Sequence, residues 1–412
     1  MKTSMSRALP KNKMRSAVPL FTLSLLSAAV LSTTSVQASG IFMQEAIIAN
    51  AGTTGAGDGV YTQSAAAMWT NPATMSHMGE SMTTVNTLLL DLEMEYTDST
   101  DNGDAKGHTI MPSVGIFHAT ELEENLHLGL ALGVVGGSSI AYGNDWAGSN
   151  ALDEVTLTVI QFNPSLAYKI DDQWSVGAGA MLSWASLEQT TATLSPDQDT
   201  DKSAGFNVGV MYKHSETWSV GASYRSKVEH NFNLDLGNIP RTQLSPSIAT
   251  DLSVPEIIDV SGQYALTQDL NLLATVQYHR WSNMDNTGMD LGLGTGLLDI
   301  ERQWSDTWKF ALGADYQLNA DWRLKAGFSY ETSPQDDPTM QWVDLPVGEQ
   351  YRYSLGASTN WGDTGVDFFY EYVDLGSVQI DRDHALIGFP GNTNINGKFD
   401  GRMHFVGVNF TF

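Results

Sequence analysis

Three cations stand where they could bind a carboxylate inside the protein. The chain carries 21 Lys and Arg against 47 Asp and Glu, a formal net charge of −26, so an inward-facing cation is informative. Lys309, Arg352 and Arg225 lie in alternating segments, opposite the apolar face. Because an unpartnered buried carboxylate is costly, these cations are candidates to hold the carboxylate of an apolar ligand. Alternatively, each pairs with a carboxylate of the same interior, and the candidates are Asp315, Glu331, Asp367 and Glu371.

Other reactive residues do not assemble into a reaction centre on the sequence alone. His404 and His118 fall on the apolar face, where a barrel lipase would carry its histidine, but neither has a serine and an orienting partner beside it. No His, Asp or Glu spacing is typical of a metal site, and the chain has no Cys. The acidic run 98–104 could hold Ca²⁺ loosely, but a solvated loop explains it as well. We expect no catalytic residue, metal or cofactor, and the acidity argues against nucleic acid as a partner.

The N-terminus predicts export followed by a compact, non-strand segment. Residues 1–38 combine a basic start, an apolar run over 17–31 and a small-residue cleavage site at Val36-Gln37-Ala38, which indicates a signal peptide. Residues 39–80 are rich in Gly and Ala and contain Asn71-Pro72-Ala73. Because everything after this segment alternates like a closed sheet, we predict that residues 39–80 form a hatch, or plug, inside that sheet.

The rest of the chain, 81–412, predicts an all-β protein built as a 14-stranded antiparallel transmembrane β-barrel. Apolar and small polar residues alternate with the period of a strand, and aromatic residues lie at the ends of the apolar face. Short turns alternate with long polar loops, as in outer-membrane barrels. The expected strands are residues 82–96, 108–118, 125–137, 155–170, 173–188, 203–213, 217–230, 254–266, 269–281, 305–318, 321–332, 350–361, 364–375 and 401–412.

The alternation also predicts which residues line the interior. We expect Leu88, Leu90, Leu92, Met94 and Tyr96 to face lipid and Leu89 to face inward. The other apolar residues expected inside are Met111, Phe117, Met181, Met211, Leu273, Phe369, Met403 and Phe405. They either pack against the plug or contact an apolar ligand, and flexible Met side chains suit ligands of varied shape.

Several motifs together resemble the FadL/TodX family of outer-membrane transporters of long-chain fatty acids and aromatic hydrocarbons. These are the Gly-rich segment ending in Asn71-Pro72-Ala73, Tyr142 with Asp145-Trp146-Ala147-Gly148, the segments at 304–313, 323–328 and 351–356, and the terminal Phe412. The resemblance implies a 14-stranded barrel with an N-terminal hatch, acting as a monomer in the outer membrane of a Gram-negative bacterium. It also implies sideways release near a kinked third strand. Where many members carry Pro-Phe-Gly, this chain has Val135-Gly136-Gly137-Ser138, and Gly136 and Gly137 can still bend a strand.

The predicted function is passive uptake of hydrophobic small molecules. Long-chain fatty acids are the first candidate and aromatic hydrocarbons the second, and a general hydrophilic porin is the alternative from another class. Ligand is expected to be captured on exposed apolar loop residues, namely Ile140, Tyr142, Trp146, Leu291 and Leu293. The expected partners are the bilayer, lipopolysaccharide and, through the aromatic-ended last strand, the barrel assembly machinery.

Overall fold

The computed structural model describes residues 45–236, 247–284, 286–290, 297–384 and 393–412. All of them belong to one compact unit, residues 36–412. The predicted signal peptide, 1–38, lies outside the described residues. Within the described ranges, no helix is long and apolar enough to span a membrane.

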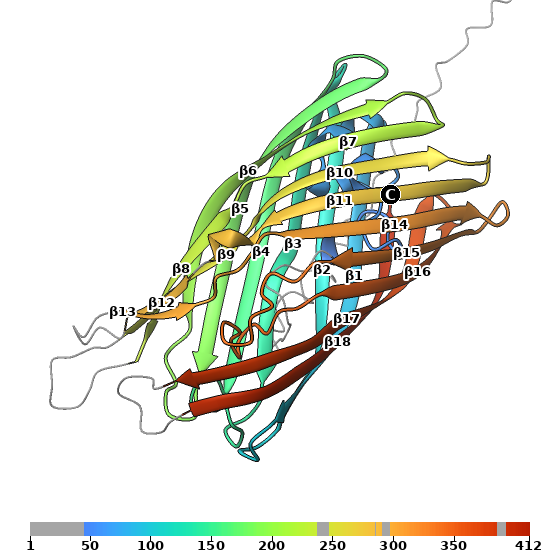
Figure 1. Ribbon diagram of the computed structural model, residues 1–412. Coiled ribbons are helices and arrows are strands. Elements are labelled where there is room, and N and C mark those ends of the chain that lie inside the picture. The colour runs from blue at the N-terminus through green and yellow to red at the C-terminus, as the bar shows by residue number, and fades with distance from the viewer. Residues whose placement is uncertain (1–44, 237–246, 285, 291–296, 385–392) are drawn as a thin grey trace, which may run out of the picture. The chain divides into compact units, whose positions relative to one another are not determined.

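Among the described residues, fourteen strands close into one antiparallel barrel, as the alternation predicted (Figure 1). The ring closes where β1 (Ser81–Asp98) pairs with both β2 (Ala105–Glu123) and β18 (Thr393–Thr411). The other barrel strands are β3 (Leu126–Ala141), β4 (Glu154–Lys169), β5 (Trp174–Thr190), β6 (Asp199–Lys213), β7 (Trp218–Arg225), β10 (Glu256–Ala265), β11 (Leu270–Arg280), β14 (Thr307–Gln317), β15 (Arg323–Glu331), β16 (Gln350–Trp361) and β17 (Thr364–His384).

A separate four-stranded sheet was not predicted. It has the order β13-β12-β9-β8 and consists of β8 (Val228–Asp235), β9 (Ser247–Val254), β12 (Asn286–Asp290) and β13 (Leu297–Glu301). The expected strand 217–230 is wrong in extent, because the structure divides it into β7 and β8. The expected strand 254–266 likewise begins at the end of β9. Pro255, which has no N–H to donate, separates β9 from β10.

Short helical turns occupy the segment before the barrel. They are η1 (Glu45–Ile47), η2 (Asp58–Val60), α2 (Ala67–Thr70) and η3 (Pro72–His77), and a further turn, η4 (Trp281–Asn283), follows β11. Most residues from 45 to 78 are buried. The Gly- and Ala-rich composition of this segment fits such crowding, because small side chains let its backbone approach its neighbours closely.

The outer surface carries apolar residues bounded by aromatic rings. On β5, Trp174 and Trp184 are 44% and 41% exposed and point outward. Ten residues of a tilted strand span roughly 25 Å along a barrel axis, about the height of an outer-membrane apolar band. The residues between them on this face, such as Val176 and Leu182, are also exposed. This face is suited to lipid.

The predicted inward and outward faces of β1 are reversed. Leu88, Leu90, Leu92, Met94 and Tyr96 are buried inside, whereas Leu89 is 52% exposed. The alternation was misleading because leucines occupy both faces over 88–92. The carboxylates of Asp91, Glu93 and Glu95 lie outside. Lys106 forms ion pairs with Glu93 and Glu95, Arg402 pairs with Glu93, and Asp91 contacts the His108 ring.

Candidate ligand path inside the barrel

The N-terminal segment, residues 45–80, is hydrogen-bonded to strands around the barrel. Gly57 N donates to Thr275 Oγ1 on β11 at 2.9 Å, and Gly59 N to Ser261 Oγ on β10 at 3.1 Å. Ala65 N donates to Thr84 Oγ1 on β1 at 2.9 Å. Ser175 Oγ of β5 donates to the carbonyl of Ala73 at 3.0 Å. Side-chain hydroxyls of the wall thus hold backbone groups of the segment from several directions.

Asn71 links the segment to the wall. Its Nδ2 donates to the carbonyl of Gly59 at 2.8 Å and to that of Val210 on β6 at 3.1 Å, while its Oδ1 accepts from Ala73 N at 3.0 Å. Pro72 occupies the first position of η3, where a missing N–H costs nothing. The Asn-Pro-Ala motif therefore caps a helical turn and ties it to β6.

Glycines of the wall make room for this segment, which the sequence reasoning missed. A Cβ built on Gly209 would lie 2.1 Å from Asn71 Oδ1, and one on Gly327 would lie 2.3 Å from the backbone C and O of Thr53. Other wall glycines in comparable contact are Gly115, Gly177, Gly221 and Gly356. The available signal was glycine at inward positions of many strands, but the sequence does not give their relative heights.

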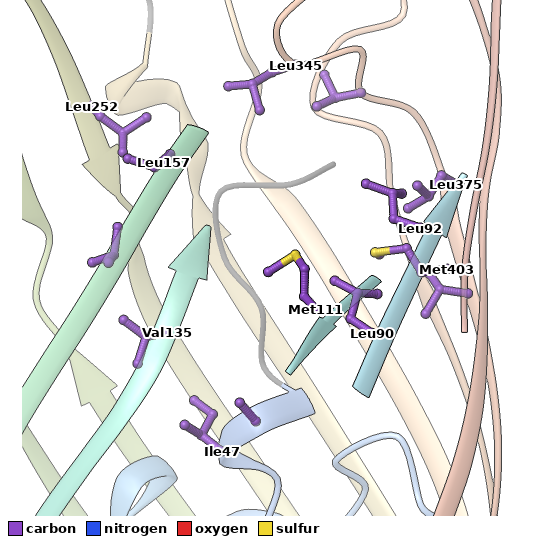
Figure 2. Close-up of a cluster of buried hydrophobic side chains, with 14 of the residues drawn as sticks. Ile47, Leu90, Leu92, Met111, Val135, Leu157, Leu252, Leu345, Leu375 and Met403 are labelled. Atoms are coloured by element: carbon purple, nitrogen blue, oxygen red, sulfur yellow. The ribbon is translucent and has the colours of Figure 1, made fainter. Parts of the chain in front are cut away.

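The interior is lined by apolar side chains. Every residue predicted there on β2, β5, β6, β11, β17 and β18 is buried, namely Met111, Phe117, Met181, Met211, Leu273, Phe369, Met403 and Phe405. The five inward residues of β1 join them. In Figure 2, Leu90 and Met111 lie on one side and Val135 of β3 on the other, with Ile47 of the N-terminal segment below.

Arg225 is a buried cation that donates hydrogen bonds to neutral groups. Its NH1 donates to the carbonyl of Trp69 at 2.7 Å and to Asn163 Oδ1 at 3.3 Å, and its NH2 to Gln161 Oε1 at 3.1 Å. The guanidinium also lies 4.6 Å from the centre of the Trp69 ring. Within the described part of the chain, no carboxylate lies within ion-pair distance of it.

A small cavity adjoins Arg225. It measures about 30 Å³ and is lined by Asp58, Trp69, Asp259 and Gln277 among others. This volume holds roughly one or two waters. A ligand carboxylate would therefore reach the guanidinium only after part of the N-terminal segment shifts.

Arg352 and Lys309 lie in a buried charge network. Arg352 Nε lies 3.2 Å from Glu45 Oε1, and its NH1 lies 3.2 Å from Glu331 Oε2. Lys309, 2% exposed, is in register with Glu331 of the neighbouring strand. The structure thus gives Arg352 the interior carboxylate partner that the sequence offered as the alternative. Because Glu45 belongs to the N-terminal segment, its ion pair with Arg352 also attaches that segment to the wall.

The ladder between β2 and β3 is interrupted. Its pairs run from Glu123↔Leu126 to Gly115↔Gly133, and the described residues form no β2–β3 pair beyond that point. Residues 105–114 of β2 still pair with β1, and 134–141 of β3 with β4. Pro112, which cannot donate to a ladder, lies in the unmatched part of β2.

The irregularity of β3 lies beside the predicted glycines. A register shift between Val134 and Gly136 leaves Val135 as the bulged residue, whereas Gly136 and Gly137 pair with Val159 and Thr158 of β4. The glycines therefore do not interrupt the ladder with β4. The β2–β3 ladder ends three residues earlier than Gly136, at Gly133.

The predicted capture residues are not exposed. Ile140, Tyr142 and Trp146 are 3%, 8% and 4% exposed. The Trp146 ring lies 5.2 Å from Tyr96 and 4.8 Å from Tyr142, and its Nε1 donates to the carbonyl of Leu152. The expectation of an exposed patch was wrong for these three because all are buried, Tyr142 and Trp146 against each other. Leu291 and Leu293 lie outside the described residues.

Known proteins share this sequence pattern and fold. Residues 29–412 match the family described as "Outer membrane protein transport protein (OMPP1/FadL/TodX)". The chain is 22% identical to "Outer membrane protein P1" of Haemophilus influenzae, covering 94% of this chain and 98% of that protein. It is 21% identical to the "Long-chain fatty acid transport protein" of Escherichia coli K12, covering 88% and 94%.

Solved structures show the same fold. A FadL homologue of Pseudomonas aeruginosa superposes with a TM-score of 0.79 at 17% identity, over 91% of this chain and 99% of that one. The toluene transporter TodX of P. putida superposes with a TM-score of 0.66 at 15% identity, over 89% and 98%. The chain belongs to the OMPP1/FadL/TodX family and is a Gram-negative outer-membrane β-barrel that serves as a transport channel for hydrophobic compounds.

Proposed function

We propose that this protein takes up long-chain fatty acids passively and releases them sideways into the membrane between β2 and β3. The observation that carries the proposal is the position of the ladder break. It lies beside the apolar interior, where Met111 of β2 and Val135 of β3 are both buried. If the apolar interior opened only to water, release of an apolar ligand would be unfavourable, because the ligand would have to move from apolar surroundings into water.

In this proposal residues 45–80 close the barrel as a plug. Two observations support a plug: the hydrogen bonds of these residues to the wall, and the wall glycines that make room for them. An apolar chain gains nothing from the aqueous periplasm beyond such a plug. Exit between β2 and β3 keeps each methylene out of water, which is worth about 0.8 kcal/mol per CH₂.

Buried cations favour fatty acids over aromatic hydrocarbons as the ligand. Arg225 has neutral partners only, so a ligand carboxylate would add the charged hydrogen bond that its surroundings lack. An uncharged aromatic ligand has no carboxylate to form this hydrogen bond with Arg225. Lys309 and Arg352 are buried in the same interior, and we assign them to the path of the carboxylate. Relatives named as long-chain fatty acid transport proteins point the same way.

Uptake by cells that lack other such channels tests the proposal. Cells producing the protein are given labelled oleate, labelled toluene or a small labelled sugar. Oleate should enter much faster than into cells without the protein, with toluene second and the sugar at background. Faster toluene than oleate uptake would favour the aromatic ligand, and entry of the sugar at the rate of an open pore would contradict the plug.

A further inference from the structure

Three residues that no transport role uses form a Ser–His–Asp chain. Ser183 of β5, His230 of β8 and Asp201 of β6 come from different elements. Ser183 Oγ lies 2.8 Å from His230 Nε2, and His230 Nδ1 lies 3.1 Å from Asp201 Oδ2. Ser183 is 1% exposed and His230 is fully buried. A nucleophile, a base and a group that orients the base therefore follow one another in hydrogen-bond contact.

The hydrogen bonds suit the imidazole to act as a base. Asp201 accepts from Nδ1, which leaves Nε2 as the acceptor that faces the serine hydroxyl. Burial lowers the pKa of His230 below its usual value, against the opposite effect of Asp201. The ring is therefore neutral at pH 7 and able to take the Ser183 proton. Asp201 is held in turn by Asn231 N at 3.2 Å.

The surroundings provide an apolar site and a candidate oxyanion donor. Met181, two residues before Ser183 on the same face of β5, forms a buried cluster with Val228 and Val254. Gln161 pairs with Ser183 across the β4–β5 ladder, so their Cβ atoms lie about 5 Å apart. Arg225 donates to Oε1 of Gln161, which fixes the orientation of this amide. The Nε2 hydrogens of Gln161 can then donate to an oxyanion.

We propose that Ser183, His230 and Asp201 hydrolyse carboxylic esters that carry an apolar acyl chain, as a second activity of the barrel. Ser183 Oγ attacks the ester carbonyl while its proton passes to His230 Nε2. The C–O bond to the alcohol breaks, and His230 returns the proton to the leaving alkoxide. Water then attacks the acyl-serine, giving its proton to His230. The acid leaves, and the proton returns to Ser183 Oγ. The net reaction is ester plus water to acid plus alcohol.

The position of these residues decides the class of substrate. Ser183 precedes the outward, exposed Trp184 on β5, and its own side chain is buried on the inward face. The side chain of Asp201 is 28% exposed, so water reaches this end of the chain of hydrogen bonds. The choice of an apolar acyl group rests on the proposed function, whereas the chemistry of the three residues does not.

Ester hydrolysis by the purified protein tests the proposal. The full protein in detergent is given p-nitrophenyl esters with acyl chains of increasing length, and it is separately treated with a fluorophosphonate probe. We expect hydrolysis that S183A lowers to background, a loss of at least about tenfold in D201N, and probe attached to Ser183 by peptide mass. The acid limb of the pH–rate profile should lie below that of an ordinary imidazole, because burial lowers the pKa of His230.

Controls separate this activity from folding and from transport. S354A removes another buried wall hydroxyl, which donates to the carbonyl of Tyr370, and should leave hydrolysis unchanged. Every variant should retain heat-modifiable gel migration, and S183A should still take up oleate. Equal hydrolysis by S183A and the parent protein, or no probe on Ser183, would show that the three residues only anchor β8 to the wall. If the parent protein itself took up no oleate, that result would instead count against the proposed function.

Discussion

The side-chain amide of Asn71 donates to the carbonyl of Val210 on β6 at 3.1 Å, and so joins the N-terminal segment to the barrel wall. The same amide holds Gly59 and Ala73 within the segment. One side chain therefore fixes both the shape of the segment and its attachment.

Replacing Asn71 with alanine should loosen the N-terminal segment. Three hydrogen bonds are lost, one to the wall and two within the segment. At about 0.5–1.5 kcal/mol net each, the docked, folded segment is destabilised by roughly 2–4 kcal/mol. We expect frequent openings and higher mean conductance of N71A in planar bilayers. N102A, in an exposed loop, is the control and should conduct like the parent. A closed, parent-like N71A would contradict the role given to this residue.

Alanine substitution should disturb one glycine of the wall and leave another unaffected. A Cβ at Gly327 would lie 2.3 Å from the backbone of Thr53, which cannot yield without moving the segment. At Gly262 the nearest atom is 3.7 Å away. We expect G327A to raise conductance or lower the melting temperature and G262A to do neither. Identical behaviour of the two variants would argue against close packing of the segment on β15.

The barrel could be predicted from the sequence because its strands have a period of two and its turns alternate in length. β1 could not be oriented, since leucines on both faces from Leu88 to Leu92 leave the period uninformative. The sheet of β8, β9, β12 and β13 lies in polar loops, where pairing depends on contacts far apart in sequence. Ser183, Asp201 and His230 escaped notice for the same reason, because three elements bring them together.

The hydrogen exchange of the N-terminal segment should depend on pH through Asp58. Burial raises the pKa of Asp58 to about 6, although its carboxylate accepts from Ala49 N and Asn50 N. The folded state therefore holds the proton more tightly than the unfolded state, whose pKa is near 4. The stabilisation is complete below about pH 4 and is lost as pH rises through 6, with a limit on the order of 3 kcal/mol.

We expect amides of residues 45–60, corrected for intrinsic rates, to become less protected between pH 4 and pH 7. D58N removes the Asp58 carboxyl and should give a flatter profile over that range. A parent profile as flat as that of D58N would rule out a buried, titrating Asp58.

Arg225 should matter for fatty acids and not for toluene. Removing its charge in R225Q is expected to lower oleate uptake about tenfold, because the carboxylate loses a charge-assisted hydrogen bond. R225K should recover part of it. The control is R280Q, which removes an outward, 54% exposed cation. Equal loss of oleate and toluene uptake in R225Q would mean that Arg225 acts only by holding Trp69.

The most direct test of sideways release is a reversible cross-link above the gap between β2 and β3. A Cβ built on Gly107 would lie 2.7 Å from Cγ1 of Ile140, within reach of a disulfide, and the chain has no other cysteine. The pair G107C/I140C joins the two strands where the gap ends. V260C/V276C, a lipid-facing pair in the continuous β10–β11 ladder, is the control.

The measurement is labelled oleate uptake before and after reduction. If ligand leaves between β2 and β3, oxidised G107C/I140C should take up oleate several-fold more slowly than the parent and recover when reduced, while the control pair is unaffected in both states. Uptake by oxidised G107C/I140C at the parent rate would contradict release through this gap.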